Sequence, residues 1–214
     1  MTADRCFDLL VLTALACVVT LGLVRGFMLY ARGVHIVVID AQRSVAQGLA
    51  DLAHAVCLLF WGYAVVAYAW PLASPPVPPQ LGIVRIDGLV TKAAGVVLSA
   101  AAIVIYALAL RAFGDSWRLG IDRQSRTPLV TGGIFAWTRN PIYVSLDLLI
   151  FGAFLTEGRL VLLALALLNA AFFHYLIRRE ESALAQAYGD EYRCYRDRVG
   201  RYVTWSAAGR GRSK

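Results

Sequence analysis

The residues best suited to chemistry lie in one stretch, Gly133–Tyr143, which reads Gly-Ile-Phe-Ala-Trp-Thr-Arg-Asn-Pro-Ile-Tyr. Pro141 suits the first turn of a helix, because the N–H that proline lacks would have no partner there. Asn140 precedes it and can act as the N-cap. An apolar sequence follows, so the stretch predicts a helix N-terminus with free amide donors at a membrane boundary. Such a helix end is a natural seat for a polar cofactor.

A pair of acids, Glu180 and Glu181, ends the next apolar run and is predicted to form the other half of the site. His174 lies one turn before Arg178 and almost two turns before Glu181, on one side of the same helix. We expect His174 to line the cavity of a second substrate. The remaining chain must bring Asn140 and Glu181 together.

Further polar residues fall inside an apolar segment near residue 50. Asp51 and His54 share one helix face, and Arg25 lies at a similar depth in the first apolar segment. Ionisable groups inside a membrane are costly, so a functional site is the first hypothesis for them. A structural Arg25–Asp51 pair is the alternative.

The composition predicts an all-α integral membrane protein. Hydrophobic residues make up 59% of the 214 residues and charged residues only 16%, which is too apolar for an ordinary soluble domain. Several apolar runs reach spanning length and lack the alternation of barrel strands. The four cysteines form no Cys-x-x-Cys pair, so neither a disulfide framework nor a metal site is predicted.

Five transmembrane helices are expected, at about residues 8–30, 47–71, 88–112, 141–157 and 159–181. The fourth is roughly 25 Å long, so the last two are predicted to form a tight hairpin. An aromatic stripe then predicts a C-terminal helix lying in the membrane interface and broken at Gly189. Residues 1–206 are interpreted as one membrane domain, with motifs in 113–203 and a disordered tail at 207–214.

The positive charges predict the orientation. Most Lys and Arg residues lie after the fifth helix or in the loops before the second and fourth, whereas Arg5, Arg85 and Arg159 fall on the opposite side. The positive-inside rule then places the C-terminus in the cytoplasm, as expected for a multi-pass protein of a bacterial inner membrane. The same distribution favours anionic lipid headgroups over nucleic acid as the partner of these charges.

The motifs resemble those of the isoprenylcysteine carboxyl methyltransferases, whose superfamily also contains phospholipid N-methyltransferases. The resemblance rests on Gly-x-Phe-Ala-Trp-x-Arg-Asn-Pro-x-Tyr-Val, on Glu180-Glu181-x-x-Leu184, and on Tyr188-Gly-Asp-Glu-Tyr192-x-x-Tyr195-x-x-x-Val199-x-Arg201. It departs from the family at Asn140, where His is frequent, and at Ile134, where Pro is frequent. Asn keeps a donor and an acceptor but does not titrate near neutral pH.

The resemblance implies S-adenosylmethionine as the methyl donor and a lipophilic methyl acceptor held by the bilayer. The most favoured reaction is the O-methylation of a carboxylate of isoprenylcysteine type. The cofactor-binding candidates are Gly133, Phe135, Trp137, Asn140, Tyr143, Glu180 and Glu181; the catalytic candidates are Arg139, Arg178 and Glu181; the acceptor-binding candidates are His54 and His174.

Physical chemistry agrees with this assignment. The two glutamates can accept bonds from ribose hydroxyls or an ammonium group, and the Asn140 amide with its helix N-terminus can hold a carboxylate. Aromatic rings can pack on adenine or flank a sulfonium. Arg139 or Arg178 would steer an anionic acceptor, whereas an amine acceptor needs a base, for which Glu181 is the candidate.

Other interpretations of the same residues are possible. The glutamates can be a solvated helix end, and Trp137 and Tyr143 can be aromatics of the membrane interface. Arg139 can simply contact headgroups, and Asn140 can be only a cap. At the level of the protein, the alternatives are a nicotinamide-dependent reductase of sterol-reductase type and a non-catalytic membrane sensor or accessory subunit. The sequence predicts no oligomeric state.

Overall fold

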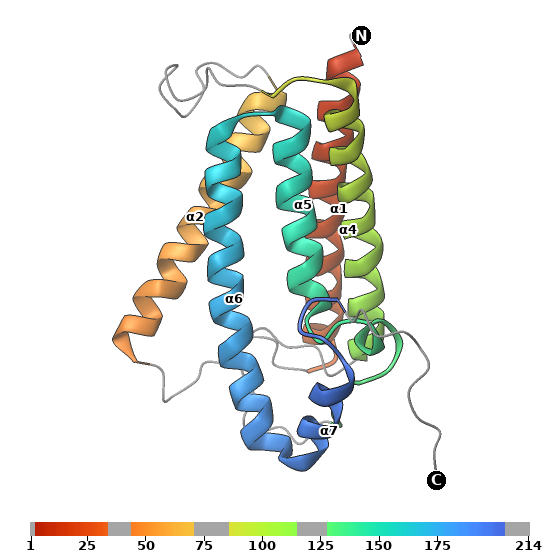
Figure 1. The fold of residues 1–214 in the computed structure, drawn as a ribbon, viewed down its shortest axis with the longest axis vertical. Helices are drawn as coiled ribbons and strands as arrows, with labels where there is room; N and C mark the ends of the chain where they lie inside the picture. The colour runs from red at the N-terminus through yellow and green to blue at the C-terminus, as the bar shows by residue number, and fades with distance from the viewer. Residues whose placement is uncertain (1–2, 34–43, 71–85, 115–127, 204–214) are drawn as a thin grey trace.

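The chain folds into a bundle of long helices with a small polar region at one end. The computed structural model describes residues 3–33, 44–70, 86–114 and 128–203 (Figure 1). Its elements are α1 (Ala3–Ala31), α2 (Val45–Ala69), α4 (Leu89–Phe113), the 3₁₀ helix η2 (Gly133–Ala136), α5 (Pro141–Glu157), α6 (Leu160–Tyr188) and α7 (Asp190–Arg198). No strand occurs in these ranges, so the all-α prediction is confirmed. The predicted tail 207–214 and part of the third loop, 115–127, lie outside the described residues.

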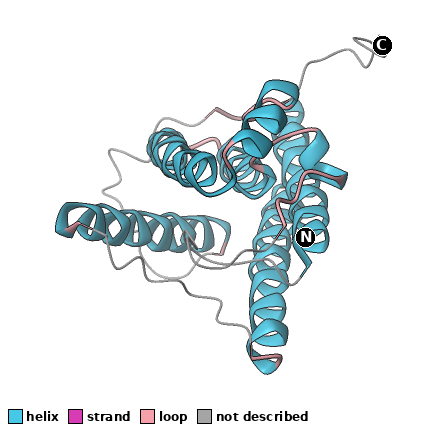
Figure 2. Cartoon of the chain, turned by 90° about the horizontal axis from the view of Figure 1, so that it is seen from below, coloured by secondary structure: helices cyan, strands magenta, loops and turns pink. Residues whose placement is uncertain are grey.

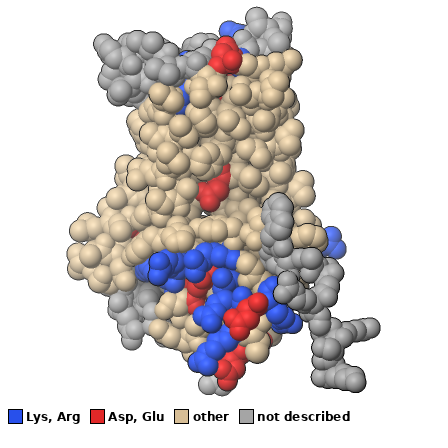
Figure 3. Space-filling model, in the orientation of Figure 1, with Lys and Arg blue, Asp and Glu red and all other residues tan. Residues whose placement is uncertain are grey.

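Four of the described helices are long and apolar enough to cross a membrane: Arg5–Ala31, Val45–Ala69, Leu89–Phe113 and Leu160–Tyr188. Large apolar side chains cover their outer surfaces, and Phe27 and Leu59 are 72% and 75% exposed. An apolar surface of this extent needs a non-aqueous neighbour. Figure 3 shows one face of the bundle that is mostly uncharged apart from an acidic patch near its middle, with most Lys and Arg gathered at the end where α7 lies.

The fifth predicted span is α5, which begins at Pro141 and ends at Glu157. It has 17 residues, roughly 25 Å, and is the shortest of the bundle helices. It packs against α1, α2, α4 and α6, and buries Leu149, Ile150 and Ala153. The five-span count is therefore not confirmed, because α5 is shorter than the four helices that are long enough to cross a membrane. It runs antiparallel to α6, to which Gly158 and Arg159 join it (Figure 1).

Small residues allow α4 and α5 to pack closely. Gly95 and Ser99 lie one turn apart on α4, opposite Gly152 and Thr156 on α5. A Cβ atom on Gly152 would lie 2.7 Å from the Gly95 carbonyl oxygen, closer than real Cβ contacts come. Small residues spaced by four bring helix backbones together in membranes, where dispersion rather than the hydrophobic effect drives association. This contact fixes α5, and with it the polar end that begins at Asn140.

We expect the Gly152→Ala variant to lower the free energy of unfolding by about 1–3 kcal/mol, because the added methyl group forces α4 and α5 apart. Thermal unfolding of the purified protein in detergent measures the change. Gly62→Ala is the matched control, because a Cβ atom on Gly62 would meet nothing within 4 Å. Equal midpoints for the two variants would contradict the role given to this contact.

Helix α2 lies at the side of the bundle and is inclined to the other helices (Figure 1, Figure 2). Polar side chains join it to α6: Asp51 Oδ1 lies 3.4 Å from Arg179 Nη1, and His54 Nε2 lies 3.1 Å from Asn169 Oδ1. These contacts give Asp51 and His54 structural partners on α6.

The C-terminal part of α6 extends past the apolar bundle. With 29 residues it is about 44 Å long, whereas a bilayer core is about 30 Å thick. The break predicted at Gly189 is confirmed: this residue has φ 54°, a conformation that favours glycine, and it separates α6 from α7. Helix α7 then turns back under the bundle (Figure 1).

The aromatic stripe of this region faces the protein rather than a membrane interface. Tyr192 and Tyr195 are only 1% and 3% exposed, and with Val199 they pack against Leu129 and Leu184. The prediction that the stripe marks an interfacial helix is therefore wrong for its apolar face. The loop that precedes η2 supplies the apolar surface on which the stripe packs, and that partner is distant in sequence.

Candidate functional site

Glu181 is the centre of a buried polar cluster at the basic end of the bundle. Its carboxylate is 9% exposed and accepts two charged partners from different segments. Arg201 binds it in a bidentate manner, with Nε 3.2 Å from Oε1 and Nη2 2.8 Å from Oε2. Arg139 Nη2 lies 3.3 Å from Oε1. Charge-assisted contacts of this geometry are the stronger class of hydrogen bond.

Asn140 joins the same cluster from the start of α5. Its Nδ2 donates to Glu181 Oε1 at 3.3 Å and to the Arg201 carbonyl oxygen at 3.0 Å. Asn140 thus stands at the predicted N-cap position, but its side chain does not cap the helix. The side chain faces Glu181 instead, which leaves the first amides of α5 without a side-chain cap. The two predicted halves of the site are in direct contact.

The segment after α7 is hydrogen-bonded to residues of this cluster and of the motif. The Arg139 amide donates to the Gly200 carbonyl oxygen at 3.0 Å, and Thr138 Oγ1 donates to the Arg201 carbonyl oxygen at 3.2 Å. The hydrogen bond to Glu181 raises the pKa of Arg201, so this guanidinium stays charged. The C-terminal segment is therefore held by backbone and side-chain bonds to the motif.

Arg139 has unused hydrogen-bonding capacity. One terminal nitrogen, Nη1, donates to the Tyr192 hydroxyl at 3.3 Å, and Nη2 faces Glu181. Its Nε is buried and has no hydrogen-bond partner in the structure. Burial raises the pKa of Tyr192, so the neutral phenol faces the guanidinium. A buried orphan donor beside the motif is a place where a ligand oxygen would be stabilised.

Glu180 faces a different side from Glu181. It accepts a 2.8 Å bond from the Tyr143 hydroxyl, and the Tyr143 ring packs on Phe173 with centroids 5.4 Å apart. Phe173 also meets His54 edge to face. The structure thus brings Tyr143 and Glu180 together next to the Glu181 cluster.

The aromatic candidates of the motif have different surroundings. Phe135 is 4% exposed and packs on Phe113 with centroids 4.7 Å apart, so it supports the loop. Trp137 is 67% exposed and is free to meet a ligand or lipid. Gly133 is exposed and has φ 61° at the start of η2.

Three further candidates lie outside the cluster. Arg178 is exposed on α6. His174 Nδ1 lies 2.6 Å from the Tyr202 hydroxyl, which reaches it from the C-terminal segment. His54 stacks on Phe172 and contacts Asn169, away from His174.

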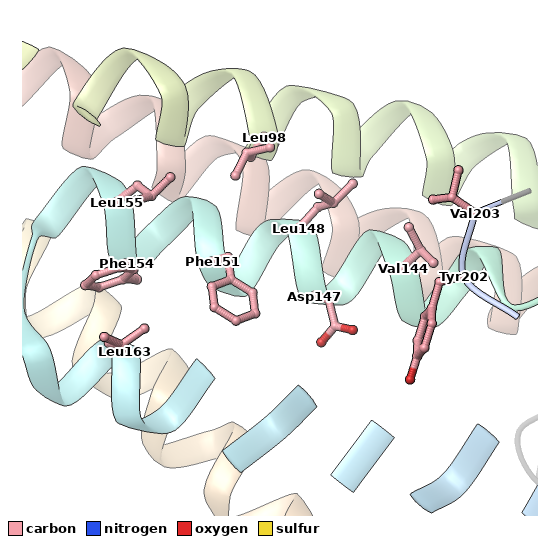
Figure 4. A pocket seen from close by; sticks show the side chains of 10 residues that line it. All are labelled: Leu98, Val144, Asp147, Leu148, Phe151, Phe154, Leu155, Leu163, Tyr202 and Val203. Atoms are coloured by element: carbon pink, nitrogen blue, oxygen red, sulfur yellow. The ribbon is translucent and has the colours of Figure 1, made fainter. Parts of the chain in front are cut away.

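An apolar groove of about 400 Å³ runs along α5 and reaches the C-terminal segment (Figure 4). Its walls come from α4, α5, α6 and residues 202–203: Leu98, Val144, Asp147, Leu148, Phe151, Phe154, Leu155, Leu163, Tyr202 and Val203. At the end nearest the polar cluster, Val144 follows Tyr143 and Tyr202 follows Arg201 in sequence. The groove therefore joins the apolar bundle to the Glu181 cluster.

Sequence reasoning gave no site role to Arg201, Thr138, Tyr192 or Tyr195. Arg201 and the two tyrosines belong to the C-terminal motif, and an Arg within it could have been paired with the buried acid. Burial raises the pKa of Tyr195, and its hydroxyl donates to the Phe135 carbonyl oxygen at 2.7 Å. Tyr195 thus positions the motif from α7.

We expect Tyr195→Phe to cost about 1–3 kcal/mol of stability, because the buried Phe135 carbonyl oxygen loses its donor. Thermal unfolding in detergent tests this. Tyr63→Phe, at an exposed tyrosine of α2 that is 54% exposed, serves as the control. A midpoint for Tyr195→Phe equal to that of the control would show that η2 does not need this bond.

Comparison with known proteins supports the assignment of the motifs. The family model described as phospholipid methyltransferase matches residues 90–191, which run from the start of α4 to the start of α7. No significant match to a curated protein was found. The matched range includes Arg139, Asn140 and Glu181. Residues 90–191 therefore match the superfamily that contains the isoprenylcysteine and phospholipid methyltransferases.

Proposed function

We propose that the protein transfers a methyl group from S-adenosylmethionine to a lipophilic acceptor at the cytoplasmic face of the membrane. The observation that carries this proposal is the 3.3 Å contact between Asn140 Nδ2 and Glu181 Oε1, which joins the two motifs of the superfamily. The clustering of Lys and Arg around α7 supports the cytoplasmic orientation (Figure 3).

The residues of this end fit the polar groups of S-adenosylmethionine. Its carboxylate suits the orphan Arg139 Nε and the uncapped amides at the start of α5. Its ammonium and ribose hydroxyls suit the Glu180 carboxylate, and the exposed Trp137 ring can stack on adenine. Glu181 can join them only by giving up a bond to Arg201, Arg139 or Asn140.

Once bound, the sulfonium supplies an activated methyl group for in-line displacement. The chain then has to orient the acceptor and exclude water, since positioning provides most of the rate in such a transfer. Hydrogen bonds that join Gly200 and Arg201 to Thr138, Arg139 and Glu181 hold the C-terminal segment against the cluster. The groove along α5 can hold the acceptor chain next to it.

Two acceptor head groups follow from the superfamily. The resemblance to isoprenylcysteine carboxyl methyltransferases favours a prenylated cysteine carboxylate, which needs no strong base. A lipid amine is the other acceptor, and it must lose a proton during the reaction. A role of Glu181 as that base requires one of its present bonds to break.

Membranes containing the protein, incubated with methyl-labelled S-adenosylmethionine and then extracted, test this function. We expect label in a lipid or lipid-modified product, suppressed by S-adenosylhomocysteine and unaffected by NADPH. The product identifies the acceptor. An absence of labelled product across lipid amines and prenylcysteine acceptors, with folded protein present, would instead favour the accessory-subunit alternative.

A further inference from the structure

The groove along α5 has an acidic residue in its wall. Asp147 lies between Val144 and Phe151 on this wall, and the other lining side chains, Tyr202 apart, are apolar. The Asp147 and Tyr202 side chains project toward the same side of α5 (Figure 4). The groove thus combines an apolar length with one polar end.

The Asp147 carboxylate is not satisfied by the protein. Its Oδ1 atom is buried and has no hydrogen-bond partner in the structure. The neighbouring Tyr202 hydroxyl lies 2.6 Å from His174 Nδ1, so it already has a partner. A buried acceptor that the fold leaves unpaired is costly, and a ligand that donates a hydrogen bond or carries a positive charge removes that cost.

The sign of the charge discriminates between ligand heads. An ammonium or amine head at this end can pair with the Asp147 carboxylate, which lines the groove. A carboxylate head would place a second negative charge beside the first and would bring no donor to it. Like charges brought together reject the wrong partner, so Asp147 acts against acidic heads as well as for amines.

We propose that Asp147 determines the acceptor class, and that the groove takes a lipid chain bearing an amine head. This rests on the proposed methyl transfer, whose donor site lies beside the same end: Val144 adjoins Tyr143, and Tyr202 adjoins Arg201. The acceptor chain lies along Leu148 and Phe151 toward Leu163. Its head is held at the level of Asp147, one helical turn from Tyr143.

Binding of matched single-chain probes, without methyl donor, tests the proposal. Full-length protein in phosphatidylcholine nanodiscs is titrated with tritiated octadecylamine or octadecanoic acid, and empty nanodiscs give the background. We expect saturable binding of the amine by the wild type and at least tenfold weaker binding of the acid. Asp147→Asn should weaken amine binding by about tenfold to a hundredfold, as expected for a lost charge-assisted bond.

Two further variants identify the site. Asp190→Asn, at an acid of α7 that is 89% exposed, should bind both probes as the wild type does. Leu148→Trp should weaken the binding of both probes, because the larger ring fills the groove. S-adenosylmethionine binding, measured separately on each variant, reports on the fold and on the proposed donor site.

Equal amine affinity in the wild type and Asp147→Asn would overturn the proposal, as would acid binding by the wild type as tight as amine binding. Undiminished amine binding by Leu148→Trp would place the probe elsewhere and also overturn it. If amine selectivity depends on Asp147 while no variant binds S-adenosylmethionine, the proposed methyl transfer fails and the amine site stands.

Discussion

Replacing Glu181 with Ala is expected to destabilise the protein by about 3–5 kcal/mol, because the buried Arg139 guanidinium and the Asn140 amide would lose their shared acceptor. The same change frees Arg201 and releases the C-terminal segment from the start of α5. We therefore expect loss of S-adenosylmethionine binding and of methyl transfer as well.

Two further variants serve as comparisons for Glu181→Ala. Glu191→Ala removes an exposed acid of α7 and should leave stability and cofactor binding unchanged. Glu181→Gln keeps an oxygen that Asn140 can donate to but removes the charge that pairs with both arginines. Its stability and its affinity for S-adenosylmethionine should therefore lie between those of the wild type and of Glu181→Ala. Thermal unfolding in detergent and isothermal titration with S-adenosylmethionine measure both effects. Wild-type stability in Glu181→Ala would show that the cluster is not a structural centre.

Asn140→Asp is the second substitution for which we expect a large effect. It keeps the size of the side chain but replaces the donor with a carboxylate oxygen, which would face Glu181 Oε1 at about 3.3 Å and the Arg201 carbonyl oxygen at about 3.0 Å. Two attractive contacts become repulsive. We expect a loss of about 2–4 kcal/mol in stability and at least a hundredfold loss in S-adenosylmethionine affinity.

Asn140→Ala separates repulsion from simple loss of a bond. It removes the donor without adding charge, so it should destabilise less than Asn140→Asp. The order wild type, Ala, Asp in thermal midpoint and in cofactor affinity is the expected result. An Asp variant as stable as the Ala variant would mean that the Asn140 side chain does not face Glu181 in the folded protein.

Local sequence signals predicted the boundaries that position the site. Pro141 predicted the start of α5, Gly158 its end, and Gly189 the break before α7, and the structure agrees at each position. Each signal depends only on the backbone properties of proline and glycine, so it needs no knowledge of distant contacts. The meeting of Asn140 with Glu181 followed from placing two motifs at one end of the bundle.

Features that depend on distant partners were not predictable in the same way. The close approach of Gly95 and Gly152 requires that α4 and α5 be neighbours, which the apolar pattern does not specify. The aromatic stripe of Tyr192 and Tyr195 has the spacing of an interfacial helix, but Leu129 covers it. Likewise, the sequence places Asp147 one helical turn after Tyr143, and only the three-dimensional arrangement shows that it lines a groove and has an unpaired oxygen.

The central claim is that the Asn140–Glu181 end binds S-adenosylmethionine. Ultraviolet crosslinking of labelled S-adenosylmethionine to the purified protein, followed by mass-spectrometric mapping, tests it most directly. We predict label in peptides containing residues 133–143 or 180–181, competed by S-adenosylhomocysteine and not by NADPH. Label confined to other helices, or competition by NADPH alone, would contradict the account.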